Sequence, residues 1–280
     1  MTDLPHNEAR SYKAFLGSPK RSIKHSTYFA VYDHLFEKYR GKPITFVEIG
    51  VLDGGSLFMW REFFGSKARI IGVELNPGAA KWREHGFEIF IGSQSDPDFW
   101  KSFFEQVGPI DLLLDDGGHT YEQQIKTVEA CVDHINDDGL LVIEDTHTSY
   151  MAGFGLKSLS LVKYGQRLSD RINQRFSELN QGSAEYRIWG VRFYESFVVM
   201  EINRTLASLK SQSIYNGGEA SHELDFRYSN GGIADFLERV LAEKKSLWAS
   251  PLIRPILKTI KKWATKFELI RRSLSVRRYF

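Results

Sequence analysis

Short apolar runs alternate with amphipathic stretches along the first half of the chain. Five runs rich in aliphatic and β-branched residues predict buried strands, at residues 44–51, 68–75, 87–93, 110–116 and 139–145. Before and between these runs, apolar side chains recur every three or four residues, which predicts helices at residues 24–40, 56–65, 79–86, 98–108 and 121–135. Because strands that alternate with helices build βαβ units, the pattern predicts a mostly parallel sheet with helices on both faces.

The pattern changes in the second half. Residues 151–185 are polar with helical spacing over 161–179, which indicates an insertion or lid. Two strand-like runs, 186–196 and 197–203, predict a hairpin added to the edge of the sheet. The segment 205–235 is rich in Ser, Asn and Gly and predicts loops, and the chain turns helical again from Ile233.

Length and composition exclude several classes of protein. The chain has 280 residues, of which 42% are hydrophobic and 26% charged, so it is neither a mini-protein nor a collagen-like or disordered chain. Its single cysteine, Cys131, excludes an internal disulfide and a multi-cysteine metal site. No apolar run approaches the ~20 residues that span a bilayer, and the first residues lack an apolar signal segment. We therefore expect a cytoplasmic protein.

The charge is distributed unevenly along the chain. Residues 251–280 contain nine Lys or Arg and one acid, a net charge of +8, so the other 250 residues carry −6 of the total +2. An acidic body argues against nucleic acid as a partner. Within the tail, residues 252–274 place apolar side chains at helical spacing with Lys and Arg on the other face. Such a helix packs on protein or lies on the cytoplasmic face of an anionic membrane, and the sequence leaves both open.

A glycine-rich loop follows the first predicted strand. Glu48, Gly50, Gly54 and Ser56 lie where this strand leads into a helix, and the free N–H groups of a helix N-terminus suit an anionic group. Glu48 is placed to pair with a cation such as the amine of an amino acid. The loop matches neither the dinucleotide fingerprint nor a P-loop, and a turn without a ligand remains the alternative.

Polar residues also follow the next two strands. Glu74 ends the second strand, where an acid commonly accepts hydrogen bonds from ribose hydroxyls. Ser93, Gln94 and Asp96 form a polar turn after the third strand that suits the edge of an adenine. Each could be a solvated loop residue, but together they follow successive strand ends.

Acids and a histidine follow the fourth and fifth strands. Asp115, Asp116 and His119 come from the segment DDGGH, and Glu144 and Asp145 follow the neighbouring strand. Since adjacent parallel strands lie ~4.8 Å apart, these carboxylates need a cation between them. Hard oxygen ligands select Mg²⁺, Mn²⁺ or Ca²⁺, and histidine suits general-base catalysis. Solvated or helix-capping acids are the alternative.

The segments VEIGVLDGGSL, GVELNP, DDGGHTYEQQ and VIEDTHTSY together resemble class I S-adenosylmethionine-dependent methyltransferases. They are most similar to the metal-dependent sugar O-methyltransferases of macrolide biosynthesis and the cephalosporin hydroxylase-like proteins. The resemblance covers about residues 20–150, and it implies a Rossmann-like, mostly parallel seven-stranded sheet. Together, the resemblance and the residue patterns predict a helical segment 1–40, a cofactor-binding domain 41–204 with a lid insertion at 151–185, and a C-terminal loop and helical extension 205–280.

The resemblance also implies roles for the candidate residues. S-adenosylmethionine would contact residues of the first four strand ends: Glu48, Gly50, Gly54, Ser56, Glu74, Ser93, Gln94, Asp96 and Asp115. Asp116, Glu144 and Asp145 would bind magnesium, and His119 would be the general base, with Asp116 beside it in catalysis. The implied activity is O-methylation of a sugar hydroxyl, on a small molecule or a glycan, by an enzyme whose homo-oligomerisation stays open. The alternatives are a catechol- or phenol-type O-methyltransferase, a nucleotide-binding Rossmann protein of another class, and a non-catalytic partner protein.

Overall fold

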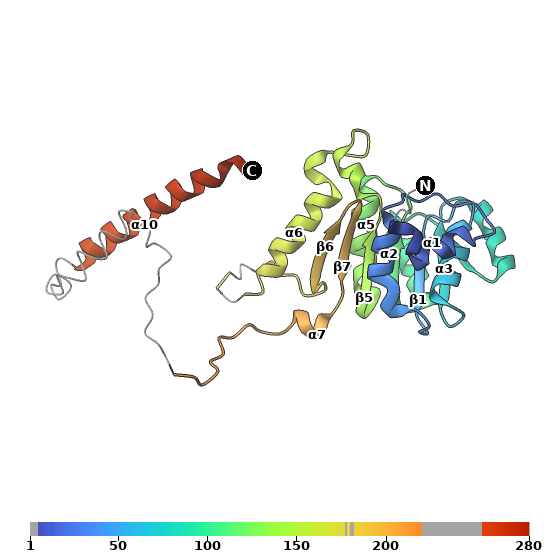
Figure 1. Cartoon of the computed structure of the whole chain (residues 1–280), viewed down its shortest axis with the longest axis horizontal. Helices are drawn as coiled ribbons and strands as arrows, with labels where there is room; N and C mark the ends of the chain where they lie inside the picture. Colours follow the sequence, from blue (N-terminus) through green and yellow to red (C-terminus); the bar gives the residue numbers. More distant parts are fainter. Residues whose placement is uncertain (1–4, 177, 180–181, 220–253, 280) are drawn as a thin grey trace. The chain divides into compact units, whose positions relative to one another are not determined.

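The computed structural model describes residues 5–176, 178–179, 182–219 and 254–279 (Figure 1). It divides into two compact units, Met1–Ser213 and Ile214–Phe280, and each is described by itself. The segment that was expected to turn helical at Ile233 lies partly outside the described residues. The finer division into residues 1–40, 41–204 and 205–280 stays a prediction.

The first unit is built on a seven-stranded sheet in the order β3-β2-β1-β4-β5-β7-β6. The strands are β1 (Thr45–Ile49), β2 (Arg69–Glu74), β3 (Glu88–Ile91), β4 (Ile110–Asp115), β5 (Ile135–Ile143), β6 (Gly190–Tyr194) and β7 (Phe197–Glu201). The first five strands are parallel, whereas β7 pairs antiparallel with β5 and with β6. The predicted parallel sheet and its edge hairpin are therefore confirmed.

Helices cover both faces of this sheet (Figure 1). The longer helices of the unit are α1 (Arg10–Leu16), α2 (Tyr28–Phe36), α3 (Gly55–Phe64), α4 (Pro97–Val107), α5 (Tyr121–Cys131) and α6 (Leu161–Asn173). Shorter helical turns are η1 (Pro5–Glu8), η2 (Glu37–Tyr39), η3 (Pro77–His85), η4 (Val132–His134), η5 (Thr146–Tyr150), η6 (Lys157–Leu159) and α7 (Arg204–Ala207).

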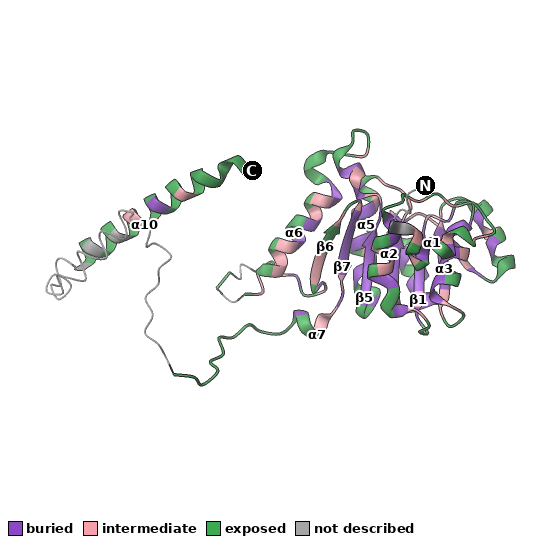
Figure 2. Cartoon of the chain, in the orientation of Figure 1, coloured by how far each residue is buried: buried purple, intermediate pink, exposed green. Residues whose placement is uncertain are grey.

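Alternate residues of each strand supply two separate cores, as the two-residue repeat of a strand requires. Phe46 and Leu114 face the first core, which α1, α2 and α3 close with aromatic rings such as Trp60. Val47 and Leu113 face the second core, against α4, α5 and α6. The central strands are consequently buried on both sides, as Figure 2 shows in purple for β1 and β7, whereas the edge strand β6 is partly exposed.

The second unit contains α10 (Arg254–Val276) and the turn η8 (Arg277–Tyr279). The C-terminal helical extension is thus present. Among the described helices, none is both long enough and apolar enough to span a membrane.

Candidate active site

A cavity of about 420 Å³ opens at the carboxyl ends of β1, β2, β4 and β5. This is where ligands bind in open parallel sheets, beside the point at which the strand order reverses between β1 and β4. Most of the residues singled out in the sequence line it: Gly50, Glu74, Ser93, Gln94, Asp116, His119, Glu144 and Asp145. Glu48, Gly54, Ser56, Asp96 and Asp115 are not among its lining residues.

The loop after β1 brings backbone to the cavity wall. Gly50 has φ 91°, and a Cβ there would lie 2.1 Å from the carbonyl oxygen of Asp116, so only glycine fits. Glu74 accepts hydrogen bonds from the amides of Val51 (2.9 Å), Leu52 (3.1 Å) and Asn76 (3.0 Å). Partial burial acts to raise the pKa of Glu74, but these amides outweigh it and hold the pKa below its usual value. Glu74 is therefore an ionised anchor for the loop.

Glu48 and Ser56 lie behind this loop rather than in the cavity. The Ser56 hydroxyl donates to Glu48 at 2.7 Å, and the Trp60 indole donates to its other oxygen at 2.9 Å. Burial raises the pKa of Glu48 to about 7, and these hydrogen bonds offset only part of the shift. Gly54 has φ 78° and leaves room for the ring of Trp82. These three residues shape the loop from within.

Asp115 and Asp96 also hold backbone in place. The Gln94 amide donates to both oxygens of Asp115 (3.1 and 2.9 Å), and its carbonyl oxygen accepts from the amide of Gly118 at 2.6 Å. This pairing fixes the DDGGH turn against the turn after β3. Burial raises the pKa of Asp115 to about 7. Asp96 caps α4 by accepting from the amide of Asp98 at 2.9 Å.

Asp116, His119 and Asp145 come together at one side of the cavity. One ligand atom from each lies within 4.8 Å of the other two, which is compact enough to hold a metal ion. His119 Nε2 lies 3.5 Å from Asp145 Oδ2, and the Tyr28 hydroxyl donates to the other oxygen of Asp145. Two carboxylates and an imidazole, all partly open to the cavity, fit a divalent cation with positions left for a ligand.

Glu144, the third acid of the predicted metal set, is engaged differently. It is 1% exposed and accepts from the Tyr32 hydroxyl at 2.7 Å. The ammonium of Lys24 lies 3.1 and 3.2 Å from its two oxygens and 2.5 Å from Asp116 Oδ2. Burial raises the pKa of Glu144, and the charge of Asp116 adds to the effect.

Lys24 therefore supplies the cation between these carboxylates in this structure. Its side chain is 2% exposed. Burial acts to lower its pKa, but the negative charges of Asp116 and Glu144 outweigh burial and raise the pKa well above the usual value. Lys24, Tyr28 and Tyr32 were not among the site residues predicted from the sequence. The two tyrosines repeat every four residues on a helix that was assigned to the core, and nothing in the sequence marks Lys24 as buried.

A second cavity of about 710 Å³ includes two residues of the first, His25 and Tyr28. Its other walls come from the start of α2, from η5, and from the hairpin of β6 and β7. Aromatic rings and hydroxyls dominate the lining: Ser26, Thr27, Tyr150, Phe193, Tyr194, Ser196 and Phe197. His147 lies here, with Nδ1 3.0 Å from the Ser196 hydroxyl. The cavity thus offers both hydroxyl groups and aromatic rings to a ligand, and His147 Nδ1 lies 3.8 Å from Asp145 Oδ1.

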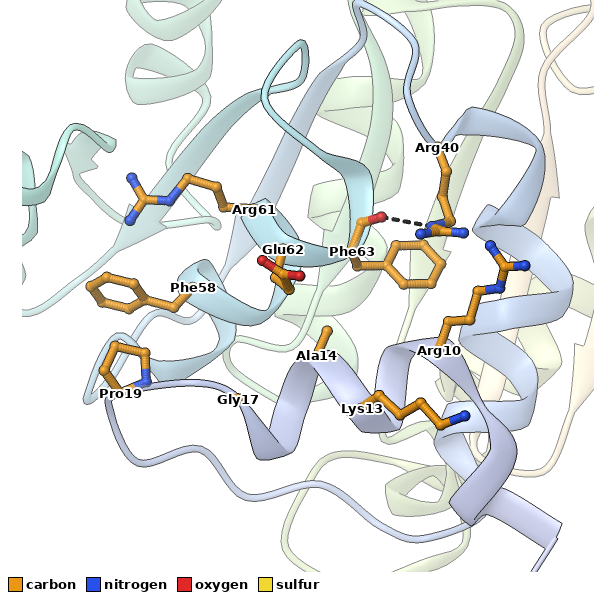
Figure 3. A pocket seen from close by; sticks show the side chains of 10 residues that line it. All are labelled: Arg10, Lys13, Ala14, Gly17, Pro19, Arg40, Phe58, Arg61, Glu62 and Phe63. Atoms are coloured by element: carbon orange, nitrogen blue, oxygen red, sulfur yellow. Dashed lines mark hydrogen bonds between the residues drawn. The ribbon is translucent and has the colours of Figure 1, made fainter.

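A third cavity, of about 440 Å³, lies between α1 and α3 (Figure 3). Its cations already have partners: Arg10 and Arg40 with Glu37, Lys13 with Glu8, and Arg61 with the carbonyl oxygen of His85. Asp116, His119 and Asp145 do not line it. The chemistry therefore belongs to the first cavity.

Comparison with known proteins agrees with this geometry. Residues 47–146 match the family model described as a methyltransferase domain. The chain is 34% identical over 145 residues to the 8-demethyl-8-alpha-L-rhamnosyl tetracenomycin-C 2'-O-methyltransferase of Streptomyces olivaceus. This alignment covers 49% of this chain and 37% of that protein. It is 30% identical over 190 residues to the demethylmacrocin O-methyltransferase of Streptomyces fradiae. This alignment covers 61% of this chain and 47% of that protein. The chain thus spans less than half the length of these two relatives.

A solved structure gives the same result. The MycE methyltransferase from the mycinamycin biosynthetic pathway, in complex with Mg and SAH, matches with a TM-score of 0.61 and 28% identity. The match covers 71% of this chain and 54% of that one. The resemblance to methyltransferases is confirmed, and a Rossmann-like protein of another class is not supported. Residues 47–146 thus resemble a methyltransferase domain, and the sheet around them has the Rossmann-like fold of the methyltransferase structure that it matches.

Proposed function

We propose that the chain is an S-adenosylmethionine- and Mg²⁺-dependent O-methyltransferase that acts on a hydroxyl of a sugar. One observation carries the proposal: Asp116, His119 and Asp145 converge between a cavity at the strand ends and an adjoining cavity with room for an acceptor. The named relatives are sugar O-methyltransferases, and MycE was crystallised with Mg and SAH, the product that S-adenosylmethionine leaves.

The first cavity is the proposed cofactor site. Gly50, Glu74, Ser93 and Gln94 line it and would contact S-adenosylmethionine, with Glu74 near the ribose. Glu48, Gly54, Ser56, Asp96 and Asp115 would act one layer further out, because their hydrogen bonds and packing fix the loops that form the wall. This arrangement positions the donor, and for an in-line displacement positioning supplies much of the rate.

The acidic cluster is the proposed metal site. A divalent cation bound there would polarise the acceptor hydroxyl and lower its pKa, most effectively for a vicinal diol. Asp116 and Asp145 are the candidate ligands with His119 beside them, and Glu144 can join only if it separates from Lys24. His119 is the proposed general base that takes the hydroxyl proton, because it lines the cavity and its Nε2 lies 3.5 Å from Asp145 Oδ2.

The test is transfer of labelled methyl from S-adenosylmethionine to defined acceptors, with and without EDTA. We expect EDTA-sensitive labelling of rhamnosides with free vicinal hydroxyls, and none when those hydroxyls are already methylated. Preferential labelling of catechol would favour the phenol-type alternative. Binding of S-adenosylhomocysteine without transfer to any acceptor in a host-cell extract would favour a non-catalytic partner protein. A cytoplasmic location, homo-oligomerisation and the role of residues 151–185 as a lid stay predictions.

A further inference from the structure

The long helix of the second unit carries a narrow apolar stripe. Ile256, Ile260, Trp263, Phe267, Ile270 and Leu274 recur at alternating intervals of four and three residues on α10. At 3.6 residues per turn they fall within an arc of about 80°. Each is between 46% and 65% exposed, so in the described residues this stripe is not covered.

Cations surround the stripe. Residues 254–278 contain nine Lys or Arg and a single acid, Glu268. Glu268 pairs with Arg271 at 2.6 Å and with Arg272 at 3.0 Å, so its charge is already balanced. Lys258, Lys262 and Lys266 follow one another along the polar side of the helix and are exposed. The helix therefore presents a strongly positive surface on either side of its apolar stripe.

The charges decide between the partners that such a stripe could bind. A second copy of the helix would bury the stripe, as in a coiled coil, but it would bring two positive flanks together. Nucleic acid would neutralise the cations but would leave Trp263 and Phe267 in water. An anionic lipid surface satisfies both features, because the acyl boundary accepts the apolar side chains while the headgroups attract Lys and Arg.

We propose that α10 binds an anionic phospholipid membrane, lying in the plane of its interface with the stripe toward the acyl chains. The helix spans about 35 Å at 1.5 Å per residue, which presents six apolar anchors along one line. The proposal does not rest on methyl transfer, since it is argued from the residues of α10 alone.

The experiment is sedimentation of the full chain with vesicles of phosphatidylcholine alone or with about 30 mol% phosphatidylglycerol. Two variants form a matched pair: Phe267→Asp breaks the stripe, and Leu269→Asp adds the same charge two residues away, outside the stripe. Leu269 is 47% exposed, so both substitutions alter an exposed apolar side chain of the same helix. Circular dichroism and the Tm of each full-chain variant verify that the rest of the protein is intact.

We expect binding to the anionic vesicles only, weakened by high salt. Phe267→Asp should lower the partition coefficient at least about ten-fold, as expected for losing one buried aromatic anchor, and Leu269→Asp should change it by less than about three-fold. Equal binding to neutral vesicles, or equal loss in both variants, would overturn the proposal. So would concentration-dependent dimerisation without lipid that Phe267→Asp abolishes, or competition in which duplex DNA displaces the chain from vesicles.

Discussion

Replacing Lys24 with methionine tests whether a buried ammonium and a divalent cation share one set of carboxylates. The substitution keeps the length of the side chain but leaves Asp116 and Glu144 without the cation that contacts them at 2.5 and 3.1 Å. Breaking a buried ion pair costs about 3–5 kcal/mol. For a unit of 213 residues, each kcal/mol lowers Tm by about 2–4 °C. The Tm of metal-free Lys24→Met should therefore fall by about 6–20 °C.

Added Mg²⁺ should then stabilise the variant more than the wild type. Two unit charges about 4 Å apart interact by about 4 kcal/mol at an effective dielectric constant of 20, so removing the ammonium should strengthen cation binding at least about ten-fold. By mass action, ten-fold tighter binding adds about 1.4 kcal/mol to the free energy of unfolding of the variant at saturating Mg²⁺. The Mg²⁺-induced rise in Tm should then be about 3–6 °C larger for the variant than for the wild type.

The assay is thermal unfolding of the full chain across a Mg²⁺ titration, with EDTA as the zero point. Lys20→Met is the matched control, because Lys20 lies on the same segment but is exposed. Lys24→Arg should keep most of the stability, since it retains the charge. The reasoning is refuted if Lys24→Met melts within about 2 °C of Lys20→Met, a shift worth no more than about 1 kcal/mol. It is also refuted if Mg²⁺ shifts both variants equally.

Three further predictions concern the site. His119→Ala should lower kcat about 10²–10⁴-fold without changing the affinity for S-adenosylhomocysteine measured by calorimetry. The control His85→Ala, outside the cavity, should leave kcat and this affinity unchanged. Full turnover in His119→Ala would exclude His119 as the general base. EDTA should abolish methyl transfer and Mg²⁺ should restore it, whereas full activity in EDTA would exclude the metal. Glu48 should make stability fall as pH rises from about 4.5 to about 7, because its raised pKa means that the folded state keeps a proton that the unfolded state loses. Urea denaturation at several pH values should show that the free energy of unfolding falls by up to about 1.4 kcal/mol per pH unit in the wild type and that Glu48→Gln removes this dependence. An unchanged dependence in Glu48→Gln would contradict the assignment of the raised pKa to burial of Glu48.

The strands were predictable because burial on both faces leaves uninterrupted apolar runs. Strand β5 begins at Ile135, four residues before the predicted run. The prediction began late because the polar residues Asn136 to Asp138 interrupt the apolar pattern. Helix α1 lies in the segment 1–40 that was predicted to be helical, but its boundaries were not assigned, because its seven residues depend on distant contacts: the amides of Arg10 and Ser11 donate to Asp33. The predicted helix at 79–86 is a 3-10 segment, η3, which apolar spacing alone does not distinguish from an α-helix.

The site was predictable where function follows from position at a strand end. Asp116, His119 and Asp145 lie at the ends of neighbouring strands, so adjacency in the sheet was enough to place them together. The orientation of Glu48 toward Ser56 and Trp60 depends on how α3 packs over β1. The position of Lys24 depends on a contact across 92 residues of sequence. Neither follows from a local pattern.

The long reach of the N-terminal segment has a consequence for the order in which the protein is made. Lys24, Tyr28 and Tyr32 find their partners 92 to 120 residues downstream, at the ends of β4 and β5. Domains emerge from the ribosome N-terminus first, so these side chains lack some of their hydrogen-bond partners in the nascent chain until residue 145 has been synthesised. Contacts of such sequence separation slow folding. The pocket is thus completed by residues that are translated well before the strand ends they contact, so a ribosome stalled before β5 holds a chain whose acidic cluster is not yet assembled.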